Sequence, residues 1–156
     1  SFNRINTDWK LVIVGAADHE DNYSRALKAK ASDSNNILMA GFQRGSAIGE
    51  LYSNAGLFVL PSYHEGMPIV ALEAMSYNLP MILSDIPANS EVASSRETFP
   101  VGDANALTQM ISLFTSAPSA LFSKSFYEKR RQRLEAEFNW DVIAKKTANV
   151  YLSIGQ

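Results

Sequence analysis

The sequence contains no cysteine, and this absence excludes several kinds of chemistry at once. Disulfide bonds, thiolate nucleophiles and zinc sites built on cysteine are all ruled out. Histidine is scarce as well, since His19 and His64 are the only two, too few for a histidine-rich metal site. No apolar run approaches the roughly 18 residues that a membrane-spanning helix needs. We therefore expect neither a metal site nor a transmembrane segment.

Charge is also low and nearly balanced. The 156 residues are 46% hydrophobic and 19% charged, with a formal net charge of -2. This composition is typical of a globular protein and not of a disordered one. The slightly acidic balance argues against nucleic acid or an anionic membrane as the main partner. We see no internal repeat and no linker, so residues 1–156 are expected to form a single domain.

The first ten residues, SFNRINTDWK, show neither an initiator methionine nor a signal-peptide pattern. We interpret the chain as part of a longer protein that has been shortened on its N-terminal side.

Short apolar runs recur along the first two thirds of the chain. Four of them stand out, at residues 11–14, 37–40, 57–60 and 81–83, and residues 98–101 form a weaker fifth. None alternates with polar residues, and Gly, Pro, Asn or Ser bounds each. Continuous apolar strands of this length are typical of a parallel sheet that is covered on both faces.

The connecting segments have the periodicity of helices. Ile48, Leu51, Tyr52 and Ala55 fall at i, i+3, i+4 and i+7, which gives one core-facing stripe. Strands that alternate with helices predict βαβ units and right-handed crossovers. The fold class that we expect is therefore α/β: a Rossmann-like, doubly wound parallel sheet of about five strands, with helices on both faces.

The last third of the chain is predicted to be helical. An amphipathic helix follows Asp103, a loop covers residues 115–120, and two C-terminal helices follow at residues 121–138 and Trp140–Ile154. The basic cluster at residues 128–133 is flanked by glutamates and favours a solvated helix face over a nucleic-acid surface. Trp140 and Tyr151 are interpreted as anchors that pack the last helix.

In an open parallel sheet, ligands bind beyond the carboxyl ends of the strands. The loops there are residues 15–18, 41–45, 61–68 and 84–90, and we expect them to meet along one rim. The third loop and its helix read PSYHEGMPIVALEAM and carry two acids, Glu65 and Glu73, in an otherwise apolar stretch.

The helix that begins near Pro68 presents free backbone N–H groups, which favour an anion such as a phosphate. Glu65 lies just before that helix start and Glu73 lies about 8 Å inside it, at 1.5 Å per residue. Two carboxylates placed in this way can each accept hydrogen bonds from hydroxyl groups beside a diphosphate. The alternative is that Glu65 is a solvated loop acid and Glu73 an exposed helix acid.

The segment SYHEGMPIVALEAMSYNLPMILSD resembles the signature region of the retaining glycosyltransferases of family 4, which have the GT-B architecture. WKLVIVG, ILMAGF, IGELYSNAGLFVLPS, FPVGDANAL and FNWDVIAKKTANVYLSI extend the resemblance over nearly the whole chain, in the order of the family. The chain is similar to the C-terminal half of such an enzyme, the half that binds the donor nucleotide.

The resemblance implies a role for each of several residues. Glu65 would be the candidate catalytic residue, orienting the transferred sugar through its hydroxyl groups instead of attacking it, and Glu73 would hold the ribose. The other implied donor-binding residues are Gly66, Met67, Pro68 and Gly15 at the sugar and diphosphate, and Ile69, Phe42 and Gln43 at the nucleoside.

The resemblance also implies what the protein needs. Its substrate would be a nucleoside diphosphate sugar, with no metal and no other cofactor. An N-terminal acceptor-binding domain of the same protein would be the partner, and the location would be cytoplasmic, with peripheral membrane association open. The family pattern begins with an Arg and a Lys that clamp the diphosphate, and neither Arg4 nor Lys10 matches them by position. The isolated chain is therefore expected to be inactive.

Two alternatives remain open. A sugar-nucleotide 2-epimerase would keep the architecture and change the reaction. A non-enzymatic receiver-like domain would need an Asp at the end of the third strand, where this sequence has Leu60, Pro61 and Ser62. No G-x-x-x-x-G-K-[ST] and no G-x-G-x-x-G motif is present, which excludes a P-loop.

Overall fold

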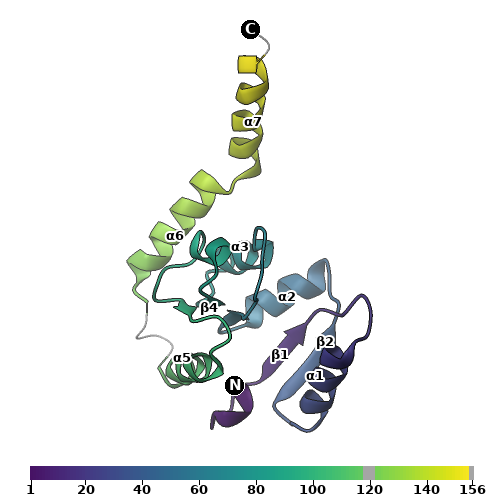
Figure 1. Cartoon of the computed structure of the whole chain (residues 1–156). Coiled ribbons are helices and arrows are strands. Elements are labelled where there is room, and N and C mark those ends of the chain that lie inside the picture. The colour runs from purple at the N-terminus through teal and green to yellow at the C-terminus, as the bar shows by residue number, and fades with distance from the viewer. Residues whose placement is uncertain (118–121, 155–156) are drawn as a thin grey trace.

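Strands and helices alternate through the first hundred residues of the computed structural model, which describes residues 1–117 and 122–154 (Figure 1). In chain order the elements are η1 (Phe2–Arg4), β1 (Leu11–Val14), α1 (Asn22–Ser32), β2 (Ile37–Gly41), α2 (Ser46–Asn54), β3 (Phe58–Leu60), α3 (Ile69–Ser76), β4 (Met81–Ser84), α4 (Pro87–Ser90), β5 (Thr98–Phe99), α5 (Ala104–Ser116), α6 (Lys124–Glu137) and α7 (Trp140–Ile154). The predicted loop at 115–120 and the predicted helix start at Leu121 lie partly or wholly outside the described residues.

All strand pairing is parallel, as predicted. β1 pairs with β2, and β4 pairs with both β3 and β5. The α/β class is therefore confirmed. The prediction of a single sheet is not confirmed. The five strands of the described chain form a two-stranded sheet, β1-β2, and a three-stranded sheet, β3-β4-β5, and no ladder joins β1 to β3.

The core is centred on β4, whose four residues are all buried. One hydrophobic cluster packs α2 and α3 against β3 and β4. A second cluster packs Ile111 and Phe114 of α5 against Ile82 of β4 and Phe99 of β5. The β1-β2 sheet differs, because Val12, Val14 and Leu38 are exposed on it. The expectation that both faces of every strand are covered is thus wrong for β1 and β2.

Local signals in the sequence account for several element ends. Asp21 and Ser24 form a capping box at the start of α1, and the Asp103 carboxylate accepts hydrogen bonds from two amides at the start of α5. Helix α3 stops before Asn78, which has a φ of 56°. Asparagine tolerates this left-handed conformation better than most residues, so it is a suitable C-terminal stop.

Helix α6 packs against α3, and one of its basic residues turns into the interior of the protein. Arg130 is buried, and its Nη1 donates to Glu97 Oε1 at 2.6 Å. Its Nη2 donates to the carbonyl of Leu79. The interpretation of residues 128–133 as a solvated face is therefore wrong at Arg130, because one position in each helical turn must face the core.

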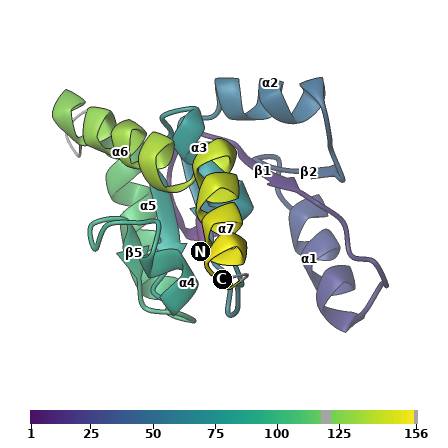
Figure 2. The same ribbon diagram turned by 90° about the horizontal axis from the view of Figure 1, so that it is seen from above.

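Helix α7 extends away from the body of the molecule and carries the C-terminus with it (Figures 1 and 2). None of the residues of α7 is buried, and Trp140 and Tyr151 are 77% and 74% exposed. The prediction that these two aromatic side chains anchor the helix is wrong. The Asn139 side chain accepts from the Asp141 amide at 2.8 Å and so caps the start of α7.

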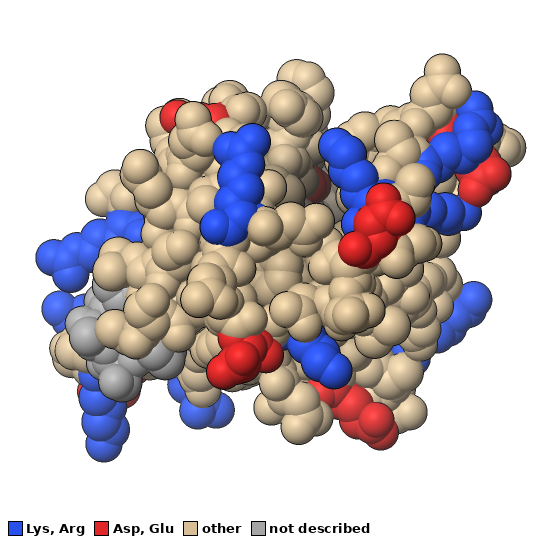
Figure 3. All heavy atoms as spheres, turned by 90° about the horizontal axis from the view of Figure 1, so that it is seen from below, with Lys and Arg blue, Asp and Glu red and all other residues tan. Residues whose placement is uncertain are grey.

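On the face that Figure 3 shows, most of the surface is neither basic nor acidic, and the Lys, Arg, Asp and Glu side chains are scattered over it. Within residues 1–117 and 122–154, no helix combines the length and the hydropathy needed to cross a bilayer.

Candidate functional site

The loops at the carboxyl ends of the strands form two groups. The Gly15 amide donates to the Gly41 carbonyl at 2.8 Å, which joins the loops after β1 and β2. The Ser84 hydroxyl donates to the Ser62 carbonyl, and this contact joins the loops after β3 and β4. The Val101 amide donates to Asp85 Oδ1 at 2.7 Å and adds the loop after β5 to the second group.

The start of α3 is open and apolar. Pro68 is buried in the cap position, and no side chain in the described chain caps this helix end. Met67, Ile69 and Val70 are 47%, 50% and 42% exposed around it. Apolar side chains that stay exposed beside an uncapped N-terminus leave room for a ligand with an apolar face and an anionic group.

Glu65 is half-buried and is held by its own loop. The Ser62 hydroxyl donates to Glu65 Oε1 at 2.6 Å. One carboxylate oxygen is therefore fixed within the loop, and the other has no hydrogen-bond partner recorded among the described residues. The alternative of a fully solvated loop acid does not match this arrangement, because Glu65 is neither fully exposed nor free to rotate.

Glu73 of α3 accepts a hydrogen bond from a side chain of α2. The hydroxyl of Tyr52, from α2, lies 2.9 Å from Glu73 Oε2 and 3.2 Å from the Val70 carbonyl. The Tyr52 ring is 8% exposed and stacks on Tyr77 with ring centroids 5.2 Å apart. Burial of this phenol, and then its hydrogen bond to Glu73, raise the pKa of Tyr52 well above its ordinary value. Tyr52 therefore keeps its proton at neutral pH, and its hydroxyl can donate to Glu73.

The two carboxylates have separate partners. No hydrogen bond or ion pair in the described part of the chain joins Glu65 to Glu73, and the start of α3 lies between them in sequence. They are not a proton-sharing pair. Each is oriented by a hydroxyl group, which suits two acids that accept hydrogen bonds from different parts of one ligand.

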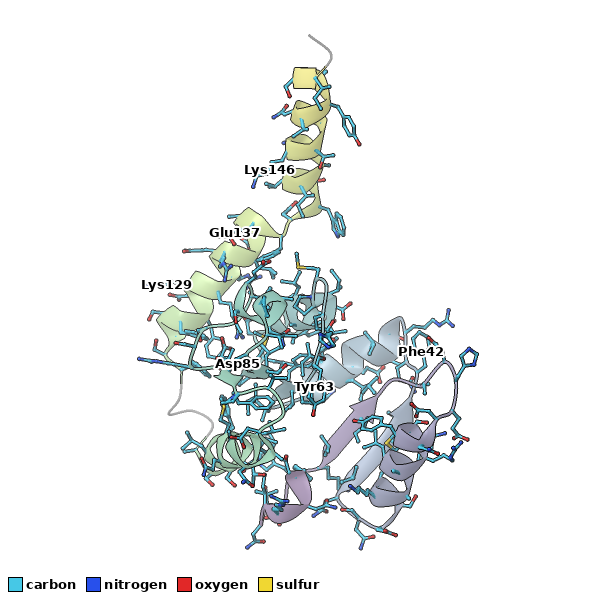
Figure 4. The ribbon with its side chains drawn as sticks, viewed as in Figure 1. Phe42, Tyr63, Asp85, Lys129, Glu137 and Lys146 are labelled. Atoms are coloured by element: carbon cyan, nitrogen blue, oxygen red, sulfur yellow. The ribbon has the colours of Figure 1, made fainter. Side chains whose placement is uncertain are left out.

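Phe42 and Gln43 belong to the first group of loops. The Gln43 side chain donates to the Ala40 carbonyl at 2.6 Å, so it turns back onto its own loop. Phe42 is 65% exposed, and the Arg44 guanidinium lies 5.3 Å from its ring centroid. Figure 4 shows Phe42 on the side of β2 and α2, apart from Tyr63 and Asp85.

Gly15 has a φ of 131°, a conformation that favours glycine, and a Cβ there would meet nothing within 4 Å. The space beside it is open, and the close approach of a ligand to this backbone stays a prediction. Gly66 has open space as well, and His19 and His64 are exposed.

Sequence reasoning missed the residues that orient the two acids. Tyr52 lies on a core-facing stripe of the sequence, and nothing in the pattern distinguishes its hydroxyl. Ser62 stands three residues before Glu65, and a hydroxyl at that distance from an acid is a recognisable loop contact. Ser84 and Asn89, which continue this contact into β4 and α4, gave no pattern that could be recognised.

Comparison with known proteins assigns the chain to a family. The sequence profile of the glycosyl transferases group 1 family matches residues 1–135. The chain belongs to this family.

Named relatives agree with this assignment. An uncharacterized glycosyltransferase of Methanocaldococcus jannaschii is 28% identical over 154 residues, covering 91% of this chain and 36% of that protein. The alpha-maltose-1-phosphate synthase of Mycobacterium tuberculosis is 30% identical over 164 residues, covering 97% of this chain and 42% of that protein. The chain thus spans less than half of the length of these relatives.

The fold is shared with solved structures. The crystal structure of Anabaena HepE in complex with UDP superposes with a TM-score of 0.84 at 17% identity, covering 97% of this chain and 43% of that chain. The catalytic domain of cholesterol-alpha-glucosyltransferase from Helicobacter pylori superposes with a TM-score of 0.63 at 15% identity. The α/β fold of this chain is thus that of one half of a GT-B glycosyltransferase.

Proposed function

We propose that this chain is the donor-binding half of a retaining glycosyltransferase that transfers a hexose from a nucleoside diphosphate to an acceptor. The observation that carries the proposal is the paired orientation of Glu65 and Glu73. Each carboxylate accepts a hydrogen bond from a different hydroxyl, and the start of α3, which no side chain of the described residues caps, lies between them in sequence. The Anabaena HepE structure with UDP-glucose supports a nucleotide sugar as the ligand, because it has the same fold.

In this proposal the diphosphate lies at the start of α3. The backbone N–H groups of Gly66 and Met67 favour negative charge there, together with the dipole of the helix that Pro68 caps. Charge develops on the leaving diphosphate during transfer, so donors that are already oriented stabilise the transition state. In this proposal, donor binding requires no metal and no other cofactor.

The two acids have different roles. Glu65 accepts hydrogen bonds from hydroxyl groups of the transferred sugar and orients its anomeric carbon. Glu73 accepts from the ribose hydroxyl groups, with Ile69 beside the nucleoside. Phe42 and Gln43 contact the base from the loop after β2, and Gly15 lets the backbone approach the phosphates.

Catalysis requires more than these residues supply. An acceptor-binding domain of the same protein, and cations that neutralise the diphosphate, would complete the site. We therefore propose that residues 1–156 bind the donor but do not turn it over.

Binding of UDP, GDP and ADP, alone and as sugar nucleotides, tests the proposal by saturation-transfer NMR and calorimetry. We expect one nucleotide class to bind. Glu73→Gln should weaken its binding about tenfold, because a hydrogen bond to a charged group is stronger than one to a neutral group. Tyr52→Phe, which removes the hydroxyl that donates to Glu73, should weaken binding about threefold. Glu50→Gln on the exposed side of α2 is the matched control and should bind like the wild type. Equal binding by wild type and Glu73→Gln would refute the ribose role.

A further inference from the structure

A chain of hydrogen bonds runs from the interior of the molecule to Glu65. It begins at Asn89 of α4, whose Nδ2 donates to the Ser84 carbonyl at 2.9 Å and to Ser84 Oγ at 3.1 Å. Ser84 Oγ donates in turn to the Ser62 carbonyl. The Ser62 hydroxyl then donates to Glu65 Oε1 at 2.6 Å. These hydrogen bonds join α4, β4 and the loop after β3. Each residue donates to the next, and the last acceptor is the Glu65 carboxylate.

The inner end of this chain is completely buried. Asn89 and Ser84 are both 0% exposed. Within the part of the chain that the structure describes, Asn89 Oδ1 has no hydrogen-bond partner, although its Nδ2 has two. A buried polar atom without a partner is destabilising, so an apolar residue would serve packing better here. A role for Asn89 in orienting Ser84 accounts for a polar side chain at this position.

We propose that Ser62 and Asn89 are positioning residues that fix the Glu65 carboxylate for the transferred sugar and so set how well the site distinguishes a nucleotide sugar from the free nucleotide. This inference rests on the proposed role of Glu65 in the function above. Ser62 acts directly on the carboxylate. Asn89 acts through Ser84, which holds the backbone of Ser62 in place.

The separation of the two acids makes the inference specific. Glu73 is oriented by Tyr52 from α2, and no hydrogen bond recorded among the described residues connects Tyr52 to Ser62, Ser84 or Asn89. Loss of the Ser62 hydroxyl should therefore affect contacts with the sugar and leave contacts with the nucleoside intact. A substitution that merely loosened the fold would weaken both.

The experiment measures the dissociation constants of UDP and UDP-glucose for the 156-residue chain and its variants. We expect Ser62→Ala to weaken UDP-glucose about three- to tenfold, since a hydrogen bond to a charged group is lost, and to leave UDP unchanged. Ser62→Thr keeps the hydroxyl and should restore UDP-glucose binding. Asn89→Ala should resemble Ser62→Ala, and Ser90→Ala, on the exposed neighbour of Asn89, is the matched control.

A second measurement needs no ligand. The side-chain carboxyl carbon of Glu65, observed by NMR, should shift in Ser62→Ala and Asn89→Ala but not in Ser90→Ala. An unchanged Glu65 signal in both variants would overturn the inference, whether or not the chain binds nucleotide. If Glu65→Gln loses UDP-glucose affinity while Ser62→Ala does not, the inference fails and the proposed function stands. If Glu65→Gln binds both ligands like the wild type, the role of Glu65 in the proposed function fails, and this inference fails with it.

Discussion

Arg130→Met should be strongly destabilising, because it leaves a carboxylate buried without its countercharge. Glu97 is 1% exposed, and its Oε1 accepts from Arg130 Nη1 at 2.6 Å. Its Oε2 keeps only the Ser94 amide and hydroxyl, at 3.1 and 3.0 Å. The same substitution also removes the donor to the Leu79 carbonyl.

The magnitude follows from the burial of both partners. Breaking a buried ion pair by removing one member costs about 3–5 kcal/mol, because the remaining charge has no compensation. This is a large share of the roughly 5–15 kcal/mol that stabilises a typical domain. Replacing both partners together, in Glu97→Leu with Arg130→Met, leaves no unpaired charge. We expect the double variant to recover at least about 2 kcal/mol of the loss, since apolar replacements of buried pairs are often nearly neutral.

The effect should also depend on pH, in a direction that the structure determines. Burial raises the pKa of Glu97, and the Arg130 charge partly opposes this shift. A carboxyl whose folded pKa is raised contributes stability that is present below its unfolded pKa, about 4.3, and is lost as the pH rises through the folded value. Without Arg130 the folded pKa of Glu97 rises further. The stability deficit of Arg130→Met should therefore be larger at pH 8 than at pH 5.

Urea unfolding followed by circular dichroism measures the four members of this double-mutant cycle at both pH values. The reasoning is refuted if Arg130→Met loses the same free energy at pH 5 and pH 8. It is equally refuted if the free-energy changes of the two single variants add up to that of the double variant.

Two further substitutions test the fold. Gly56→Ala should lower the free energy of unfolding by about 1–3 kcal/mol through overpacking, because its Cβ would lie 2.5 Å from Cη2 of Trp9. A change in tryptophan fluorescence should accompany this loss. An unchanged urea midpoint would show that Trp9 does not pack there. Asp103→Ala should cost about 1 kcal/mol, because two amides at the start of α5 lose the carboxylate that caps them at 2.9 Å. Thermal unfolding measures this loss, and Asp103→Asn, which can still cap, should retain most of the stability.

The sequence predicts the order and type of the strands and of the longer helices, but not the short helices η1 and α4, the second of which lies within the loop expected at residues 84–90. Each strand is an apolar run bounded by turn residues, and each connector has one apolar stripe, so local pattern and tertiary structure agree. The stop at Asn78 and the cap at Asp103 are equally local. The partial separation of β1 and β2 from the rest could not be predicted in this way, because an apolar run does not say which strand lies beside it.

In the candidate site, too, local features could be predicted from the sequence and contacts between distant positions could not. Glu65 and the start of α3 could be located from one contiguous motif. Tyr52 lies 21 positions before Glu73, and Ser84 lies 22 positions after Ser62, so neither contact leaves a periodic trace in the sequence. Burial of Arg130 was missed for a similar reason, because its partner Glu97 is 33 positions away.

Tyr52 links α2 and α3, the helices that follow the two groups of loops. In the described chain no ladder joins β1 to β3, so sheet hydrogen bonds do not fix the distance from Phe42 and Gln43 to Glu73. The ring of Tyr52 packs in the core with Phe58 and Tyr77, while its hydroxyl holds Glu73. Because α2 also follows directly from the loop that carries Phe42, Tyr52 connects the region proposed for the base to the carboxylate proposed for the ribose. Tyr52→Phe keeps the packing and removes only the hydroxyl, so a loss of nucleotide affinity in that variant would come from the contacts of this hydroxyl with Glu73 and with the Val70 carbonyl.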